Sequence, residues 1–332
     1  MALEDYVAIL ALAGMLAYSL LGGADFGGGI WDLFAAGPRR DEQRSAIARA
    51  MGPVWEANHV WLIFVLVLLF TSFSVAFSAA SIGLFGLLHG LLLGITLRGA
   101  AFVFRGPKVT GQGTHRWGIL FGISSTITPV FLGMALGALS SGNLRVVDGQ
   151  VHVPGPTPGL APVSLVMGVL ALTLCAQLAA VYLTKETTGA LQEDFRQRAL
   201  WSEVAAVCLA VLALPLLRLE APHLWSGLMA GRATGIAVAA GVAAALSGWA
   251  LWQRRFGLAR IATAAEVGLL LLGWGVAQYP YLIYPDLTIH NTAGPEPTLR
   301  FVLYSFPIGM ALLIPSLWLL LHVFKGISLL PK

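Results

Sequence analysis

Long apolar stretches set the strongest limit on what this chain can fold into. About 20 apolar residues are needed for a helix to cross the roughly 30 Å hydrocarbon core of a bilayer. The 332-residue sequence is 57% hydrophobic and only 11% charged, with a mean hydropathy of +0.79. This composition excludes a soluble domain and predicts an all-α, polytopic membrane protein. The nine predicted spans are residues 5–23, 53–79, 81–104, 117–140, 160–184, 199–219, 234–252, 258–280 and 301–324.

The connections between these spans are short, so residues 1–332 are expected to form a single integral-membrane domain. The second and third spans are so close in sequence that a tight helical hairpin is expected between them, and eight spans are the alternative count. Glu4 and Asp5 stand where a signal peptide would carry basic residues. The first span is therefore expected to remain in the mature protein.

The lysines and arginines are distributed unequally between the two sides that the predicted spans define. Of the 20 basic residues, four fall on one side and the rest on the other. Because basic loops stay in the cytoplasm, the N-terminus is predicted outside and the C-terminus inside. The net charge of +4 is attributed to this asymmetry and to membrane lipid, and no nucleic-acid partner is expected. The four residues on the outer side are Arg145, Arg218, Arg232 and Arg300.

The stretch "GPVWEANHVWLIF" places polar groups at the start of the second span. Pro53 suits the first position of a helix, and Glu56 would then lie in the first turn, with His59 on the same face. One interpretation is a hydrated helix end at the cytoplasmic interface, anchored by Trp55. The other is a proton path, because ionisable groups are energetically costly within membrane spans and commonly mark routes for protons or ions. The sequence leaves both open.

Asp25 repeats this pattern at the end of the first span, where it lies among glycines in "SLLGGADFGGGIWDLF". Close helix packing explains the glycines. Arg98 ends the third span, where its side chain is expected to reach toward the cytoplasmic interface or to pair with Glu56 or Asp25. His89 is interpreted as a packing residue. The sequence shows no bis-histidine pattern for haem and no CxxC metal pattern, so no metal site is predicted.

Four motifs, "GGADFGGGIWDLF", "GPVWEANHVWLIF", "LRGAAFVFRGPK" and "QYPYLIYPDLTIHNTAGP", closely resemble subunit II of the cytochrome bd-type quinol oxidases. The box formed by Gly52, Pro53, Trp55, an acidic residue and Asn58 is the most specific. The resemblance implies two four-helix bundles plus a peripheral helix. It also implies pairing with a haem-bearing subunit I in the bacterial inner membrane, as a heterodimer of the respiratory chain that small accessory subunits can join.

The resemblance also implies a reaction, in which a quinol is oxidised and oxygen is reduced to water with cytoplasmic protons. Haem b belongs to the partner subunit, and whether haem d accompanies it is left open; this chain is expected to bind no haem but can hold a structural quinone. Glu56 and Asp25 match acidic positions of the family, and Glu56 is associated with proton uptake. Val103 replaces an acidic residue of some members, and His59 stands where others have Glu or Gln.

Two other functions remain as alternatives to an oxidase subunit. A secondary transporter would need charges near the middle of the membrane, for which Glu266 is the best candidate. A purely structural partner of a haem subunit is the minimal interpretation. The proton-path candidates are Glu56, Asp25, His59 and Arg98, and no catalytic residue is predicted in this chain.

Overall fold

The computed structural model describes residues 1–51, 55–105, 112–153, 157–229 and 231–326, which are mostly helical. The short strands form two antiparallel pairs, β1 (Arg145–Val147) with β2 (Gln150–His152) and β3 (Tyr281–Ile283) with β4 (Leu287–Thr288). The all-α prediction is confirmed. The helices are α1 (Leu3–Leu33), α2 (Arg40–Met51), α3 (Trp55–Ser72), α4 (Ser74–Gly83), α5 (Phe85–Phe104), α6 (Gln112–Ser140), α7 (Pro162–Glu186), α8 (Gly189–Glu220), α9 (Pro222–Met229), α10 (Thr234–Trp252), α11 (Phe256–Gln278) and α12 (Glu296–Gly326).

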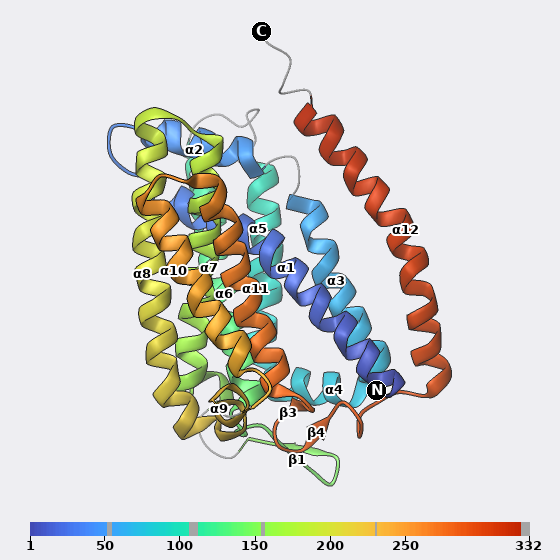
Figure 1. The fold of residues 1–332 in the computed structure, drawn as a ribbon. Helices are drawn as coiled ribbons and strands as arrows, with labels where there is room; N and C mark the ends of the chain where they lie inside the picture. The colour runs from blue at the N-terminus through green and yellow to red at the C-terminus, as the bar shows by residue number, and fades with distance from the viewer. Residues whose placement is uncertain (52–54, 106–111, 154–156, 230, 327–332) are drawn as a thin grey trace.

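In these described ranges, eight helices are long and apolar enough to cross a membrane. A ninth span results if α3 and α4, which are bent by 113° relative to each other, are counted as one. The chain is therefore a multi-pass membrane protein. Figure 1 shows α2 at the end of the molecule where the C-terminus lies, and α9 with both strand pairs at the opposite end near the N-terminus.

The second predicted span does not continue as one helix to residue 79, and the predicted tight hairpin is wrong. Helix α3 ends at Ser72, and α4 turns sharply away before α5 begins and packs on α6. The side chain of Phe73 is fully buried at this corner. The backbone N–H of Gly294 donates to the carbonyl oxygen of Ser72 at 2.7 Å. This bond satisfies a carbonyl group that a helix end would otherwise leave unpaired.

Helix α1 is longer than predicted, because it continues through the glycine-rich stretch to Leu33 instead of ending near residue 23. The reason is its close packing against α7. A Cβ atom on Gly27 would lie only 1.9 Å from the carbonyl oxygen of Cys175, so a larger residue would separate the two helices. Packing of this kind outweighs the low helix propensity of glycine. Asp25 consequently lies inside a helix.

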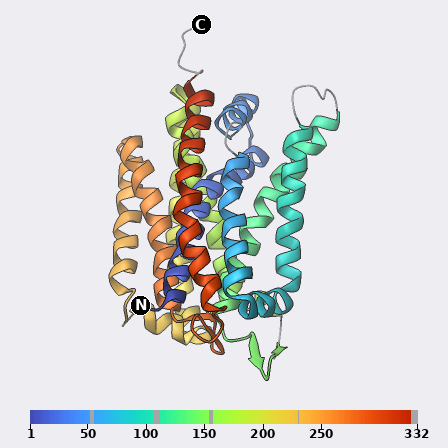
Figure 2. The same ribbon diagram turned by 90° about the vertical axis from the view of Figure 1, so that its right-hand side faces the viewer.

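The helices form two groups that meet along α1 and α7. Helices α3, α5 and α6 join α1 in an N-terminal group, and α8, α10 and α11 join α7 in a C-terminal group. Helix α7 also contacts α6 and α11 contacts α1, so the two groups share one interface. Helix α12 stands at the edge, where it touches only α1 and α3 closely, and it lies in front of the other helices in Figure 2.

Candidate functional site

Asp25 and Asn58 meet between α1 and α3, and both side chains are buried. Asp25 is 4% exposed, and its Oδ2 accepts a hydrogen bond of 2.7 Å from Nδ2 of Asn58. The amide of Asn58 also reaches the carbonyl oxygen of Leu21 at 3.4 Å. A buried carboxyl group needs such donors, because its desolvation is otherwise unfavourable. The sequence predicted both residues as important but did not predict that they bind each other.

Arg98 on α5 is 1% exposed, so the prediction that its side chain reaches the cytoplasmic interface is wrong. Its Nε donates to the hydroxyl of Ser125 at 3.1 Å, and its guanidinium lies 4.8 Å from the ring centre of Phe26. It is close enough to Asp25 for an electrostatic interaction, although no direct ion pair joins them among the described side chains. Its Nη1 and Nη2 atoms also have no hydrogen-bond partner in the described part of the chain.

His59 lies beside Asn58 on α3 and faces aromatic rings of α1. The ring centre of His59 is 6.0 Å from that of Tyr18 and 6.1 Å from that of Phe26. The imidazole therefore belongs to the same cluster, which we call the Asp25 cluster: Tyr18, Asp25, Phe26, Asn58, His59, Arg98 and Ser125.

Several predicted residues lie at the edge of what the structure describes. Gly52 and Pro53 fall outside the described residues, so the predicted start of the second span at Pro53 is not tested. Trp55 and Glu56 belong to the first turn of α3, but their side chains are outside the description. The structure therefore brings Asp25, Asn58, His59 and Arg98 together and leaves the place of the Glu56 carboxyl group a prediction.

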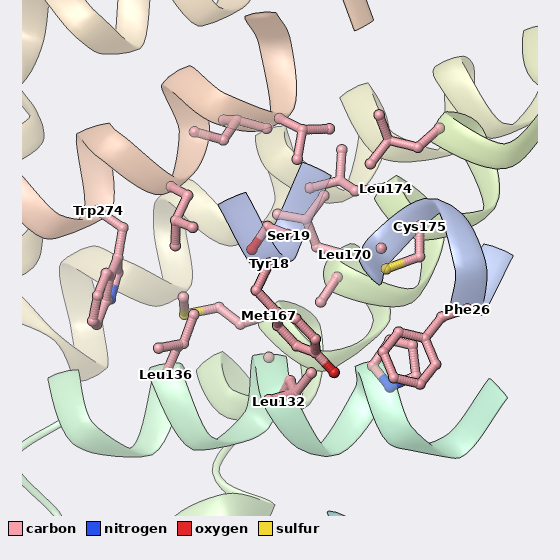
Figure 3. Close-up of a pocket in the computed structure, with 18 residues that line it drawn as sticks. Tyr18, Ser19, Phe26, Leu132, Leu136, Met167, Leu170, Leu174, Cys175 and Trp274 are labelled. Carbon is pink, nitrogen blue, oxygen red and sulfur yellow. The ribbon is translucent and has the colours of Figure 1, made fainter. Parts of the chain in front are cut away.

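An apolar cavity of about 160 Å³ lies next to the Asp25 cluster, between α1, α6, α7 and α11. Figure 3 shows Phe26 and Cys175 at one end of it and Trp274 and Leu136 at the other, with Tyr18 between. The hydroxyl of Tyr18 is buried and has no hydrogen-bond partner within the described residues. The cavity can therefore hold a largely apolar molecule and offer the Tyr18 hydroxyl to a polar group on it.

A second buried polar cluster lies inside the C-terminal group. The sequence did not predict that its members contact each other. Nε2 of Gln177 donates to Oε2 of Glu203 at 2.6 Å and to Oε2 of Glu266 at 2.8 Å. The hydroxyl of Ser247 donates to the same oxygen of Glu203 at 2.6 Å and lies 2.8 Å from that of Thr263. We call these five residues the Glu203 cluster. A glutamine in the middle of an apolar span was the signal that could have identified it.

The sixth span was predicted to begin at residue 199, but α8 begins at Gly189, so Glu203 lies well inside the helix. His89 is exposed on α5, and its Nδ1 lies 2.8 Å from the carbonyl oxygen of Phe85 on the same helix, so its interpretation as a packing residue stays a prediction. No group of three or more His, Cys, Asp or Glu side chains suited to a metal ion occurs in the described part of the chain.

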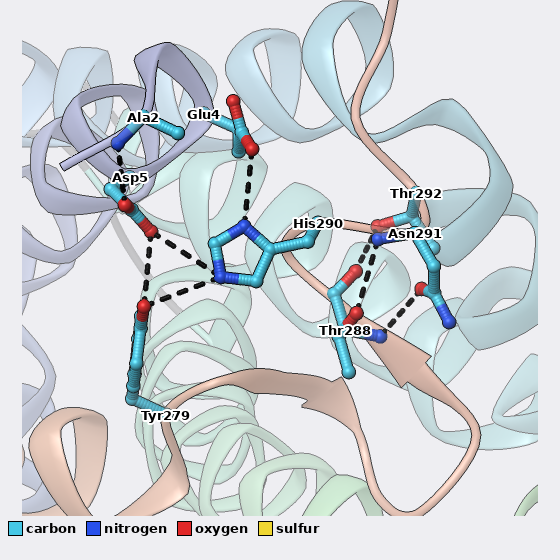
Figure 4. Close-up of polar contacts among 8 residues, drawn as sticks. All are labelled: Ala2, Glu4, Asp5, Tyr279, Thr288, His290, Asn291 and Thr292. Carbon is cyan, nitrogen blue, oxygen red and sulfur yellow. Dashed lines mark hydrogen bonds and ion pairs between the residues drawn. The ribbon is translucent and has the colours of Figure 1, made fainter.

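A third polar cluster joins the start of α1 to the segment that follows α11, as Figure 4 shows. His290 lies between two acidic residues, with Nδ1 3.1 Å from Oε1 of Glu4 and Nε2 3.8 Å from Oδ1 of Asp5. The hydroxyl of Tyr279 donates to the same oxygen of Asp5 at 3.3 Å. His290 is exposed and Asp5 is buried, at the end of the molecule where the N-terminus lies, so the cluster connects these segments at the surface.

The fold and its apolar helices define an all-helical membrane protein, and comparisons with known proteins identify its family. The sequence pattern of the family described as "Cytochrome bd terminal oxidase subunit II" matches residues 3–324. The chain therefore belongs to this family and is a subunit of a bd-type quinol oxidase, as the resemblance predicted. The transporter alternative is not supported.

Individual relatives agree with this assignment. The chain is 25% identical over 320 residues to the putative cytochrome bd menaquinol oxidase subunit II of Bacillus subtilis, covering 92% of this chain and 91% of the relative. It is 27% identical to subunit 2 of the cytochrome bd-I ubiquinol oxidase of Escherichia coli, covering 60% of this chain and 52% of the relative. The bd oxidase structure from Geobacillus thermodenitrificans has the same fold, with a TM-score of 0.80 at 24% identity, covering 98% of this chain and 99% of that one.

Proposed function

We propose that this chain, paired with a haem-bearing subunit I, carries protons from the cytoplasm toward the site of oxygen reduction through the Asp25 cluster. The reaction of the complex is quinol oxidation coupled to reduction of oxygen to water. The observation that carries the proposal is the buried Asp25 carboxyl group, hydrogen-bonded to Asn58 and within electrostatic range of Arg98. Ionisable groups buried in a membrane protein mark proton and ion pathways.

The position of Asp25 along α1 fits proton uptake from one end of the molecule. Asp25 is eight residues before the end of α1 at Leu33, which corresponds to about 12 Å of helix. That end lies on the same side as α2, which with the loop before it carries Arg39, Arg40, Arg44 and Arg49. By the positive-inside rule this side is cytoplasmic, so the N-terminus lies outside and the C-terminus inside the bacterial inner membrane.

The apolar cavity of this chain suits a quinone as a bound group. Haem b, and haem d where present, is assigned to subunit I, as the resemblance to the family implies. The apolar cavity beside the Asp25 cluster fits part of a structural quinone, and the free hydroxyl of Tyr18 can donate to a quinone carbonyl. Such a quinone would be a bound structural group here, and the type of quinone is open.

The test replaces Asp25 by Asn in the assembled complex and measures oxygen consumption with a quinol substrate. We expect at least a tenfold loss, because one lost proton-transfer group costs on the order of 10²-fold or more in acid–base catalysis. Glu56→Gln should act in the same direction. Asp41→Asn on the exposed surface of α2 is the matched control. Wild-type turnover of both Asp25→Asn and Glu56→Gln with an intact haem spectrum would contradict the proton path, whereas loss of haem would indicate a role in assembly.

A further inference from the structure

The Glu203 cluster has no role in the proposed proton path, and it combines two carboxyl groups with no counter-charge. Gln177, Ser247 and Thr263 are 0% exposed, Glu266 is 3% exposed and Glu203 is 5% exposed. The five side chains come from α7, α8, α10 and α11, so every helix of the C-terminal group contributes. Because four helices contribute side chains, the polar residues of one helix alone do not account for the cluster.

The two carboxyl groups share one donor. The same nitrogen, Nε2 of Gln177, donates to Oε2 of Glu203 and to Oε2 of Glu266. This brings the two acidic groups next to each other inside the protein. Two ionised carboxylates cannot share a buried site without strong repulsion, so such pairs retain a proton.

Two buried oxygen atoms of the cluster also lack a hydrogen-bond donor. Oε1 of Gln177 and Oε1 of Glu203 are fully buried and accept no hydrogen bond from any described residue. Ionised carboxylates only accept hydrogen bonds, whereas a protonated carboxylic acid also donates one. A proton on one of the two glutamates would therefore add an O–H donor, which these two oxygens lack.

No basic side chain in the described ranges neutralises the pair. The one charged group that interacts with Glu266 is Glu203, and for Glu203 the contributing side chains are Ser247 and Gln177. Arg98 and Asp25 interact with each other on the opposite side of α7 and contribute to neither glutamate. Six arginines of α8, α11 and the connections beside α10 have other partners: Arg196 and Arg254 bind Glu193, Arg198 donates to Gln43, Arg232 lies over Tyr279, Arg255 lies over Trp249, and Arg260 lies over Tyr182.

We propose that Glu203 and Glu266 together form a proton-binding site inside the C-terminal group, occupied by at least one proton at neutral pH. It is separate from the Asp25 cluster, because Cys175 and Gln177 are two residues apart on α7 and point to opposite faces of that helix. Cys175 lines the cavity beside the Asp25 cluster, and Gln177 faces the two glutamates. The subunit thus holds two ionisable sites, one on each side of α7.

The test is infrared difference spectroscopy of the purified complex at neutral pH, in H₂O and in D₂O. The double variant Glu203→Gln/Glu266→Gln is subtracted from the wild type, and the two single variants show which residue carries the proton. We expect the wild type to have a carbonyl band of a protonated carboxylic acid that shifts in D₂O and is absent from the double variant. The control Glu296→Gln removes an exposed, ion-paired glutamate and should change only carboxylate bands.

Two outcomes would overturn the proposal. The first is a subtraction that contains only carboxylate bands, which would mean that both glutamates are ionised. The second is a carboxylate band that moves when sodium is exchanged for potassium or choline, which would mean that an alkali cation neutralises the pair. If the double variant loses its haem spectrum, the spectra of the two single variants are compared with the wild type instead. A proton on the pair must shift the carboxylic-acid band in at least one of these single variants.

Discussion

The two buried clusters on either side of α7 hold carboxyl groups in different ways. Asp25 has a hydrogen-bond donor, Asn58, and a buried cation, Arg98, within electrostatic range. Glu203 and Glu266 have donors, chiefly Gln177, but no cation. The first arrangement tolerates an ionised carboxylate, whereas the second requires a proton or a bound cation. One subunit therefore stabilises buried carboxyl groups in two different ways.

Removal of the buried cation Arg98, which only the Asp25 cluster has, should have the largest effect on stability. Arg98→Met leaves Asp25 without its buried positive neighbour, and we expect the complex to lose about 4 kcal/mol of stability, as when one member of a buried charge pair is removed. The measurement is thermal unfolding followed by haem release. Asp25→Asn/Arg98→Met should recover much of the loss. If the double variant is no more stable than Arg98→Met, the two residues do not stabilise each other.

Close packing of α1 on α7 should be the next most sensitive feature. Gly27→Ala places a methyl group against the carbonyl oxygen of Cys175, so the backbones must separate, and we expect a loss of about 3 kcal/mol. Gly241→Ala on α10 is the matched control, because beyond the adjacent backbone of α10 no described atom lies within 4 Å of a Cβ at that position. Thermal unfolding of both variants is the measurement. Equal stability of the two would show that Gly27 does not set the distance between the helix groups.

Removal of the shared donor should have a smaller effect on the Glu203 cluster. Gln177→Leu leaves two buried carboxyl groups without that hydrogen bond, and we expect a loss of about 2 kcal/mol, typical of unsatisfied buried polar groups. Ser247→Ala removes only one donor to Glu203 and should cost less. Denaturation curves of the purified complex compare the two. A larger effect for Ser247→Ala would contradict the central position of Gln177.

An ion pair exposed to water should show the smallest effect and supplies the contrast with both buried clusters. Arg145 binds Asp286 at 2.8 Å near β1, and this contact lowers the pKa of the Asp286 carboxyl group. The stability that it contributes is therefore complete above the ordinary aspartate pKa of 3.8 and is lost as the pH falls below it. Asp286→Asn should lower the unfolding temperature slightly at neutral pH, and the difference should shrink in acid. A difference that grows in acid would contradict this sign.

Much of the fold could be predicted from hydropathy, because lipid requires continuous apolar helices. The predicted span 234–252 coincides with α10, and 258–280 lies within two residues of the ends of α11. The break after Ser72 could not be predicted, because the residues around it include no proline or glycine. One of the contacts at this break comes from Gly294, more than 200 residues later in the chain.

The sequence predicted the residues of the candidate site but not how they contact each other. Asp25, Asn58, His59 and Arg98 each stood out as polar residues in apolar surroundings, and the structure brings them together. That Arg98 is fully buried depends on the rings of Phe26 and Phe121, which come from other helices. The Glu203 cluster was missed because its five members are spread over four helices, and only packing shows that they share one nitrogen atom.

The bond between Gly294 and Ser72 also has a consequence for the time at which this subunit becomes complete. A ribosome makes Ser72 early and Gly294 only just before α12, so this contact at the corner between α3 and α4 cannot form until most of the chain has been made. Until then the carbonyl of Ser72 needs water or another donor. The order of synthesis therefore makes the connection before α12 one of the last parts of the chain to join the α3–α4 corner.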